Sequence, residues 1–344
     1  MHIFRGLHHP GIAPACALTI GNFDGVHRGH RAMLALLNRQ AQERGVVSCA
    51  LTFEPHPRDY FAAALHKPAL APARIGTLRD KLSELAQCGV QQAIVLPFNA
   101  TLAAQPAQAF IDEVLVRSLG ARYVLVGDDF RFGAQRAGDC TLLKASASAQ
   151  GFEVGRMESY VVDGLRISST AVRQALASGD MAAAAQLLGR PYAISGHVVH
   201  GRKLGRALGA SRQGADDGFR TLNLRFTHWK PAASGIFAVH VHGLSEQPLP
   251  GVANLGVRPS IDPSDVNGGR VLLETHCLEW PAHLGAEGAY GKIIRVELLH
   301  KLHDELKYDS LDALTTGIAR DGVEARAWFA AHAQTHRQTT RDRI

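Results

Sequence analysis

The sequence predicts an α/β protein of two domains, a parallel sheet with helices followed by an antiparallel barrel or sandwich with one helix. Three observations predict this fold class. The chain of 344 residues exceeds the usual size of a single domain. Apolar runs alternate with helical patterns in the first half, as in βαβ units. Short segments of alternating polarity, separated by turns rich in Gly and Pro, fill most of the second half.

The first half contains four apolar runs that are typical of strands buried on both faces. These predicted strands cover residues 17–20, 46–53, 92–96 and 123–127. Helical patterns occupy residues 31–44, 81–88, 110–119 and 168–188, the last of them broken at Gly179 and Asp180. Ligands bind at the carboxyl ends of parallel strands, so a site is expected in the loops that follow Ile20, Phe53, Leu96 and Val126.

The second domain is expected to begin after Gly189-Arg190-Pro191, which ends the helical stretch. Its strands are predicted at residues 194–200, 221–226, 235–242, 272–278 and 293–299. A single helix over residues 311–333 follows, and the polar end of the chain is expected to be frayed. The predicted division is therefore 1–188 for the first domain, 189–334 for the second and 335–344 for a disordered tail.

Composition narrows the function classes. Lys and Arg number 37 against 31 Asp and Glu, a net charge of +6, but no basic block with interleaved aromatics predicts nucleic-acid binding. The five cysteines form no C-x-x-C pair, which argues against a zinc site or a disulfide framework and favours the cytoplasm. No apolar run approaches the ~20 residues of a membrane span, and the first residues do not resemble a secretory signal.

The strongest motif is Gly21-Asn22-Phe23-Asp24-Gly25-Val26-His27-Arg28-Gly29-His30, directly after the first predicted strand. Its glycines allow a sharp turn and a close approach to a ligand. The next helix begins at about Gly29 or His30, so its free N–H groups and positive dipole end face whatever binds in the loop. Two imidazoles there can donate hydrogen bonds to phosphate. A bare His-x-x-His pair is weak evidence, because such pairs are also surface residues or metal ligands.

Three further groups of residues fit a nucleotide, each with an ordinary alternative. Asp128 and Asp129 follow a strand and suit a ribose or Mg²⁺, although one of them could cap a turn. Arg166 and Arg173 offer fixed positive charge for a polyphosphate, or are solvated surface charges. The hydroxyls of residues 168–170 either meet phosphate or cap a helix, and Ser168 could be a cap alone.

These blocks resemble the nucleotidyltransferase superfamily, and in particular the FAD synthetase module of bacterial bifunctional riboflavin kinase/FAD synthetases. The matching segments, in order, are the loop 21–30, Thr52-Phe53-Glu54-Pro55-His56-Pro57, 126–139 and 166–173. The resemblance implies a Rossmann-like fold in which His27 and His30 are catalytic. It implies that ATP and its phosphates are bound by Gly21, Asn22, Phe23, Asp24, Gly25, Asp129, Arg166, Ser168, Ser169, Thr170 and Arg173.

The second half resembles riboflavin kinase, from Gly196-His197-Val198-Val199-His200-Gly201-Arg202-Lys203-Leu204-Gly205-Arg206 to the segment 304–311. The resemblance implies a small antiparallel β-barrel with a C-terminal helix, with Glu274 accepting the proton of the 5′-hydroxyl of riboflavin. Thr221 and Asn223 would hold Mg²⁺. Flavin and ATP would be bound by Gly201, Lys203, Gly205, Arg206, Asn254 and Arg258.

One departure from the family pattern lies in this half. A polar insertion at 210–218 precedes Thr221, and Arg220 stands where the family has a proline that presets the turn. Three hypotheses follow. The first is a bifunctional enzyme that uses ATP and Mg²⁺ to make FMN from riboflavin and FAD from FMN, without nucleic-acid or membrane partners. The second is FMN adenylyl transfer alone, with a weakened or merely flavin-binding barrel. The third is a flavin-responsive regulator that binds nucleic acid.

Overall fold

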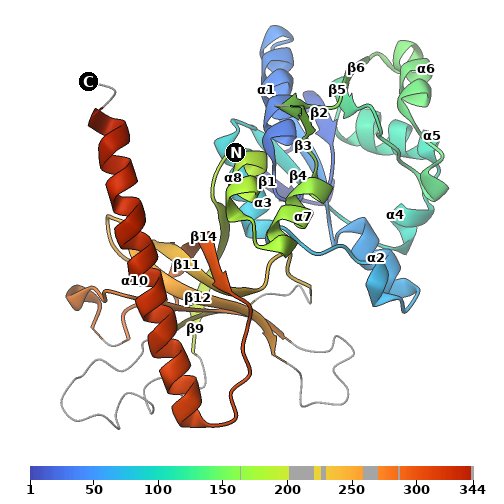
Figure 1. Cartoon of the computed structure of the whole chain (residues 1–344). Helices are drawn as coiled ribbons and strands as arrows, with labels where there is room; N and C mark the ends of the chain where they lie inside the picture. Colours follow the sequence, from blue (N-terminus) through green and yellow to red (C-terminus); the bar gives the residue numbers. More distant parts are fainter. Residues whose placement is uncertain (163, 201–220, 226–229, 259–269, 286, 342–344) are drawn as a thin grey trace. The chain divides into compact units, whose positions relative to one another are not determined.

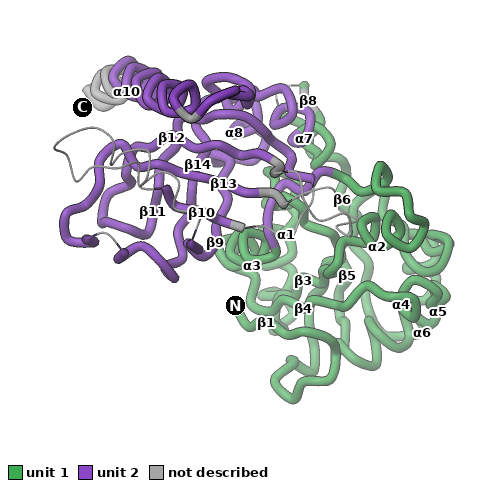
Figure 2. The backbone as a smooth tube through the Cα atoms, turned by 90° about the horizontal axis from the view of Figure 1, so that it is seen from below, with its two compact units in different colours: residues 1–72, 78–171 green, residues 73–77, 172–344 purple. Residues whose placement is uncertain are grey.

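The computed structural model describes residues 1–162, 164–200, 221–225, 230–258, 270–285 and 287–341, without the side chains of 165, 225, 257, 258, 270, 271, 311 and 333–341. The chain divides into two compact units. Unit 1 comprises residues 1–72 and 78–171, and unit 2 comprises 73–77 and 172–344 (Figure 2). Each unit is built around its own sheet.

Unit 1 contains a six-stranded sheet in the order β1-β4-β3-β2-β5-β6 (Figure 1). The strands are β1 (His2–Arg5), β2 (Cys16–Ile20), β3 (Val47–Glu54), β4 (Gln92–Pro97), β5 (Ala121–Gly127) and β6 (Glu153–Met157). All pairings between them are parallel, which confirms the predicted parallel sheet. The four predicted strands are the four central ones. The two edge strands, β1 and β6, lack continuous apolar runs because much of their length is exposed or half-buried.

Successive side chains of each strand point to opposite faces of the sheet. The central strands are apolar at both sets of positions, so helices cover both faces. One core contains Leu18 of β2 and Val124 of β5, and the other contains their neighbours Ala17 and Leu125. The helical segments of unit 1 are α1 (Arg28–Glu43), α2 (Pro57–Ala64), η1 (Pro68–Leu70), α3 (Leu78–Gln87), α4 (Ala100–Ala104), α5 (Ala107–Ala109), η2 (Phe110–Ser118, with wider π-type turns), η3 (Ala134–Arg136) and α6 (Cys140–Gln150). A short hairpin of β7 (Val161–Val162) and β8 (Leu165–Arg166) precedes α7.

Unit 2 contains a closed antiparallel barrel in the order β10-β13-β12-β11-β14-β9. Its strands are β9 (Tyr192–Val199), β10 (Thr221–Arg225), β11 (Gly235–His242), β12 (Leu249–Arg258), β13 (Arg270–Cys277) and β14 (Ile293–His303). The pairing of β10 with β9 closes the ring, which decides for a barrel over a sandwich. The strand that the sequence does not predict, β12, is interrupted by Gly251, Asn254 and Gly256, so its alternation is weak.

Helices α7 (Ser169–Ser178) and α8 (Met181–Leu188) are the predicted broken pair, followed by α10 (Leu311–Arg341), which runs past its expected end near residue 333. Unit 2 contains most of α7 and all of α8, because its main segment starts at Val172, whereas the functional boundary after residue 188 stays a prediction. Helix α8 belongs to unit 2 because it packs against β14 and β9. A 3₁₀ turn, η4 (Ala282–Leu284), lies between β13 and β14.

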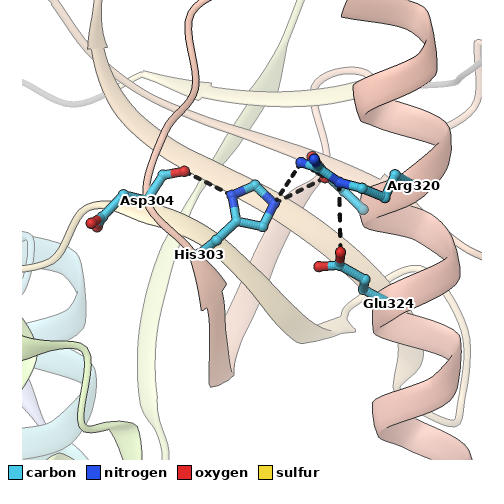
Figure 3. Close-up of polar contacts among 5 residues, drawn as sticks. His303, Asp304, Arg320 and Glu324 are labelled. Carbon is cyan, nitrogen blue, oxygen red and sulfur yellow. Dashed lines mark hydrogen bonds and ion pairs between the residues drawn. The ribbon is translucent and has the colours of Figure 1, made fainter.

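Helix α10 is fixed to β14 by a polar cluster around His303 (Figure 3). The ring of His303 contacts the carboxylate of Asp321 at 2.9 Å and the carbonyl oxygen of Asp304 at 2.7 Å. Arg320 contacts Asp321 at 3.1 Å and Glu324 at 3.5 Å. Burial lowers the pKa of His303, but the Asp304 carbonyl and the Asp321 carboxylate outweigh it, so the pKa lies above 6.5. Asp321 is itself buried, so its carboxylate needs these polar partners.

Replacing Asp321 with Asn is expected to lower the free energy of unfolding of unit 2 by about 1–3 kcal/mol, because His303 and Arg320 lose the buried carboxylate that is their anionic partner. A raised folded pKa means that the His303 contribution is complete below pH 6.5 and is lost as the pH rises through the folded pKa. The loss should therefore be larger at pH 6 than at pH 8.5. Urea unfolding followed by tryptophan fluorescence measures it, because the described tryptophans, Trp280 and Trp328, belong to unit 2.

The matched control is Glu324→Gln, which removes an exposed carboxylate from the same cluster and should change stability little at either pH. Equal losses for the two variants, or a loss from Asp321→Asn that does not vary with pH, would contradict the assignment of the His303–Asp321 pair as the stabilising contact.

Candidate active sites

The loop between β2 and α1 has an unusual backbone. Phe23 and Val26 have φ angles of 48° and 40°, and Gly25 lies between them with φ of 84°. The left-handed region is unfavourable for a β-branched residue such as Val26. Both side chains are buried, at 1% and 0% exposure, so the core holds the loop in this shape. Backbone strain maintained in this way is typical of functional sites.

His27 caps helix α1, and His30 lies on the first turn of that helix. The backbone N–H of His30 donates to Nδ1 of His27 at 3.3 Å, and the two rings stack with centroids 3.7 Å apart. Because an amide N–H only donates, Nδ1 of His27 accepts, and the neutral ring carries its proton on Nε2. Burial, followed by the electrostatic effects of His27 and Lys81, holds the pKa of His30 well below its usual range. His30 is therefore a neutral imidazole at neutral pH.

Side-chain hydrogen bonds connect the loop to other elements of unit 1, two of them directly and one through Thr52. The hydroxyl of Thr52 on β3 donates to the carbonyl oxygen of Asn22 at 3.3 Å. The ammonium of Lys81 on α3 donates to the Thr52 hydroxyl at 3.2 Å. The hydroxyl of Ser169 at the start of α7 donates to the carbonyl oxygen of Asp24 at 3.0 Å. Segments more than a hundred residues apart in sequence therefore meet at this loop.

The two aspartates after β5 have different surroundings. The carboxylate of Asp128 accepts a hydrogen bond from the Ser159 hydroxyl at 2.8 Å, and this bond is the main cause that lowers the pKa of Asp128. Asp129 is 83% exposed and faces Arg166 at 3.6 Å. The predicted pair Asp129 and Arg166 is thus brought together at the carboxyl end of the sheet, where a solute can reach both side chains.

Other predicted residues lie differently. The hydroxyl of Ser168 accepts from the backbone N–H of Ala171 at 3.2 Å, which is the helix-cap role considered as the alternative, and Thr170 is exposed. The Phe23 and His30 rings pack in an edge-to-face arrangement, with centroids 5.2 Å apart. Because the Phe23 ring is buried, only its backbone can meet a ligand. Arg173 belongs to unit 2, where its Nε donates to the carbonyl oxygen of Ala73 at 2.7 Å.

Unit 2 brings three predicted residues into one row across adjacent strands. Asn223 of β10 and Asn254 of β12 both pair with Glu274 of β13, so the three side chains share one face of the sheet. Asn223 is buried, whereas Glu274 and Asn254 are half-buried. Thr221 lies two residues before Asn223, on the same face of β10. The amide nitrogen of Asn223 donates to the carbonyl oxygen of Thr221 at 3.2 Å.

Glu305 joins this row, although the sequence analysis does not single it out. The amide nitrogen of Asn254 donates to the Glu305 carboxylate at 3.2 Å. Gly256 makes room for that carboxylate, because a Cβ atom there would lie 2.9 Å from both of its oxygens. The Asn254 side-chain oxygen is buried without a hydrogen-bond partner among the described residues, as expected of an atom that meets a ligand.

Several expectations for this unit fall outside the described residues. They concern Gly201, Lys203, Gly205, Arg206, the insertion at 210–218 and Arg220. Arg258 is placed at the end of β12 by its backbone alone. Within the ranges that the structure describes, no group of three or more His, Cys, Asp or Glu side chains forms a metal site. None of the helices in those ranges combines the length and apolar character needed to cross a membrane.

Comparisons with known proteins give a consistent result for both halves. The family model of FAD synthetase matches residues 10–171, and that of riboflavin kinase matches residues 188–329. A bifunctional riboflavin kinase/FMN adenylyltransferase of Escherichia coli K12 is 44% identical over 331 residues, which cover 96% of this chain and 98% of that protein. The namesake proteins of Haemophilus influenzae and Pseudomonas fluorescens are each 40% identical and are covered to 99%.

One solved structure has the same two-part architecture over nearly the whole chain. It is described as a macrolide-efflux protein from Streptococcus pneumoniae and is 25% identical in sequence, with a TM-score of 0.70. The similarity covers 95% of this chain and 100% of that chain. The arrangement of a parallel sheet followed by a barrel is therefore shared with an experimentally determined structure.

Proposed function

The chain belongs to the bacterial family of bifunctional riboflavin kinase/FMN adenylyltransferases, and we propose which of its residues carry the two activities. The enzyme phosphorylates riboflavin to FMN with ATP and joins FMN to the AMP of a second ATP, giving FAD and pyrophosphate. An adenylyltransferase with a merely flavin-binding barrel is not favoured, because the riboflavin kinase family matches residues 188–329. A nucleic-acid regulator is not favoured either, because both matched families are enzymes that act on small molecules.

We assign adenylyl transfer to the loop between β2 and α1. The observation that carries this assignment is the pair of stacked imidazoles at the N-terminus of α1, beside a loop of strained backbone. When the FMN phosphate attacks the α-phosphorus of ATP, negative charge grows on the α-phosphate oxygens. The Nε2–H of His27, the neutral ring of His30 and the free N–H groups of α1 would stabilise that charge. Catalysis would be positional and electrostatic, without a covalent intermediate.

The remaining ATP contacts of this site are proposed from the family motif. Asp129 and Arg166 face each other at the exposed edge of the sheet and suit the ribose and the polyphosphate. Ser169 is tied to Asp24 of the loop, so its position follows that of the loop backbone. Gly21, Asn22, Gly25, Thr170 and Arg173 complete the proposed set, with backbone contacts from Phe23 and Asp24 and a capping role for Ser168.

We assign phosphoryl transfer to the row Asn223, Glu274 and Asn254 in unit 2. Glu274 would accept the proton of the riboflavin 5′-hydroxyl as that oxygen attacks the γ-phosphorus of ATP. Asn223 and Asn254 flank it across the strands and would orient it and the flavin. Gly201, Lys203, Gly205, Arg206 and Arg258 are proposed to hold the phosphates and the flavin on the family motif alone.

Mg²⁺ is proposed at Thr221 and Asn223. The donor set fits this ion, because hydroxyl and amide oxygens are hard ligands and Mg²⁺ takes few protein ligands, with the rest from water and phosphate. The Asn223 amide nitrogen is engaged with the Thr221 carbonyl, so its side-chain oxygen is the atom that a metal would take. The ion would neutralise charge on the ATP phosphates.

Two coarser assignments complete the proposal. Residues 1–188 are proposed as the functional adenylyltransferase domain and 189–334 as the kinase domain, with 335–344 outside both. A cytoplasmic location is proposed because ATP is the co-substrate and all five cysteines are free thiols.

The direct test is incubation of the full chain with riboflavin, ATP and Mg²⁺, with the flavins separated by chromatography. FMN is expected first and FAD second, and supplied FMN should give FAD without riboflavin. A protein that never converts FMN to FAD would contradict the assignment of unit 1. A protein that converts FMN but not riboflavin would revive the adenylyltransferase-only hypothesis, with the insertion at 210–218 and Arg220 as its cause.

A further inference from the structure

Helix α3 carries a lysine on its buried face. Lys81 is 4% exposed and lies beside Glu84 and Leu85, which are buried on the same face of the helix. Lysine is almost never fully buried unless its charge is compensated or used, because desolvating an ammonium group is costly. A buried cation in this place therefore needs a physical reason.

The contacts of Lys81 lead to the adenylyl-transfer loop. Its ammonium donates to the Thr52 hydroxyl at 3.2 Å, and that hydroxyl donates in turn to the carbonyl oxygen of Asn22 at 3.3 Å. Because a hydroxyl has a single proton, the ammonium orients it by occupying its acceptor side. The three groups form a chain from α3 through β3 to the second residue of the loop.

The charge of Lys81 also acts on His30. The titratable neighbours that act electrostatically on His30 are His27, which precedes α1, and Lys81 of α3. Glu84, one turn along α3, is engaged with Arg31 of α1 at 3.2 Å, and the loop itself contributes the buried Asp24. Burial, then His27, then Lys81 lower the pKa of His30. The ammonium thus favours the neutral imidazole at the place where phosphate oxygens are expected.

Two polar atoms of the loop region are buried and lack hydrogen-bond partners among the described residues. They are the side-chain oxygen of Asn22 and Nδ1 of His30. Such atoms are rare in folded proteins and mark places where a ligand or water completes the bonding. Both belong to residues that Lys81 influences, Asn22 through the Thr52 link and His30 through its charge.

We propose that Lys81 is a positioning residue for adenylyl transfer, which fixes the Asn22 carbonyl through Thr52 and supplies a permanent positive charge behind the triphosphate site. This inference rests on the assignment of the loop to FMN adenylylation. In a site shielded from water, a fixed cation lowers the energy of negative charge that develops nearby, without reorganisation during the reaction. The same cation disfavours protonation of the His30 ring.

The test compares Lys81→Met with Arg79→Met, which removes an exposed positive charge from the same helix. Lys81→Met is expected to lower kcat for FAD formation from FMN by about 10- to 100-fold, as for other small misplacements of reacting groups. In ¹⁵N-labelled protein, titration of the His30 ring should show a higher pKa than in the wild type. Arg79→Met should match the wild type in both measurements, and riboflavin phosphorylation in the same preparations reports on the integrity of the chain.

Two further variants separate charge from linkage. Thr52→Val cuts the chain to Asn22 but keeps the ammonium, so kcat should fall without the rise in the His30 pKa. Lys81→Arg keeps the charge, so the His30 pKa should stay low and part of the rate should return. If Lys81→Met fails to fold, the rates and His30 titrations of these two variants still test the proposal.

The proposal would be overturned if Lys81→Met behaved like Arg79→Met, if its His30 titration stayed that of the wild type, or if Thr52→Val kept full kcat. A wild-type protein that makes no FAD from FMN would instead refute the assignment of the loop itself. The two failures are therefore distinguishable.

Discussion

Replacing His27 with Ala is expected to abolish FAD formation from FMN while riboflavin is still converted to FMN. The structural reason is that His27 supplies two things at once. Its Nδ1 caps helix α1 by accepting from the His30 N–H, and its Nε2–H is the donor proposed to meet the α-phosphate. Loss of one donor to a developing oxyanion costs about 10²- to 10³-fold in kcat. His30→Ala should have an effect of the same order, because it removes the ring stacked on His27.

The cap and the donor can be separated. His27→Ser keeps a side-chain oxygen that can cap the helix but removes the imidazole. Its stability should therefore be close to that of the wild type, whereas its rate of FAD formation should be as low as that of His27→Ala. His27→Ala should in addition lower stability by about 0.5–2 kcal/mol, as other cap deletions do. The matched control is His8→Ala, which changes an exposed histidine of the same unit. Full FAD formation by His27→Ser would show that the imidazole is a cap and nothing more.

The fold was predictable where burial leaves a strong pattern. The central strands β2, β3, β4 and β5 are buried on both faces and are continuous apolar runs in the sequence. The sequence does not predict the edge strands β1 and β6, because they bury only part of their side chains and so lack an apolar run. It does not predict β12 either, because Asn254 and Gly256 interrupt its alternation, and these are residues of the candidate kinase site. Function thus removes the local signal of the strand that carries it.

The site was predictable only in its local part. The place of the two histidines near the N-terminus of a helix follows from a motif of ten residues, although α1 begins at Arg28 rather than at Gly29 or His30. The link from Lys81 to Thr52, by contrast, joins side chains that are 29 residues apart in sequence. A lysine in an amphipathic helix is expected on the solvent side. In the structure, Lys81 lies on the buried face of α3 together with Glu84 and Leu85. The same holds for Glu305, which meets Asn254 from 51 residues away. Phe23 is a related case, because its place in the motif does not reveal that its ring is in the core.

Replacing Glu274 with Gln is expected to have the opposite effect on the two activities. FMN formation from riboflavin should fall by about 10²- to 10⁴-fold, the usual contribution of a general base. FAD formation from supplied FMN should persist, because the stacked histidines belong to unit 1. Gln has nearly the same size as Glu and keeps its place between Asn223 and Asn254, so the row across β10, β13 and β12 should remain intact. What is lost is the basic oxygen alone.

The control for Glu274→Gln is Glu279→Gln, an exposed glutamate just beyond the end of β13. Both variants are assayed for both reactions, with thermal unfolding to compare their stability. A Glu274→Gln enzyme that still phosphorylates riboflavin at the wild-type rate would exclude Glu274 as the base. Loss of both activities at unchanged stability would instead mean that the adenylyl-transfer step depends on an intact kinase site. Because the two products are separate flavins, a single chromatogram of each variant distinguishes these outcomes.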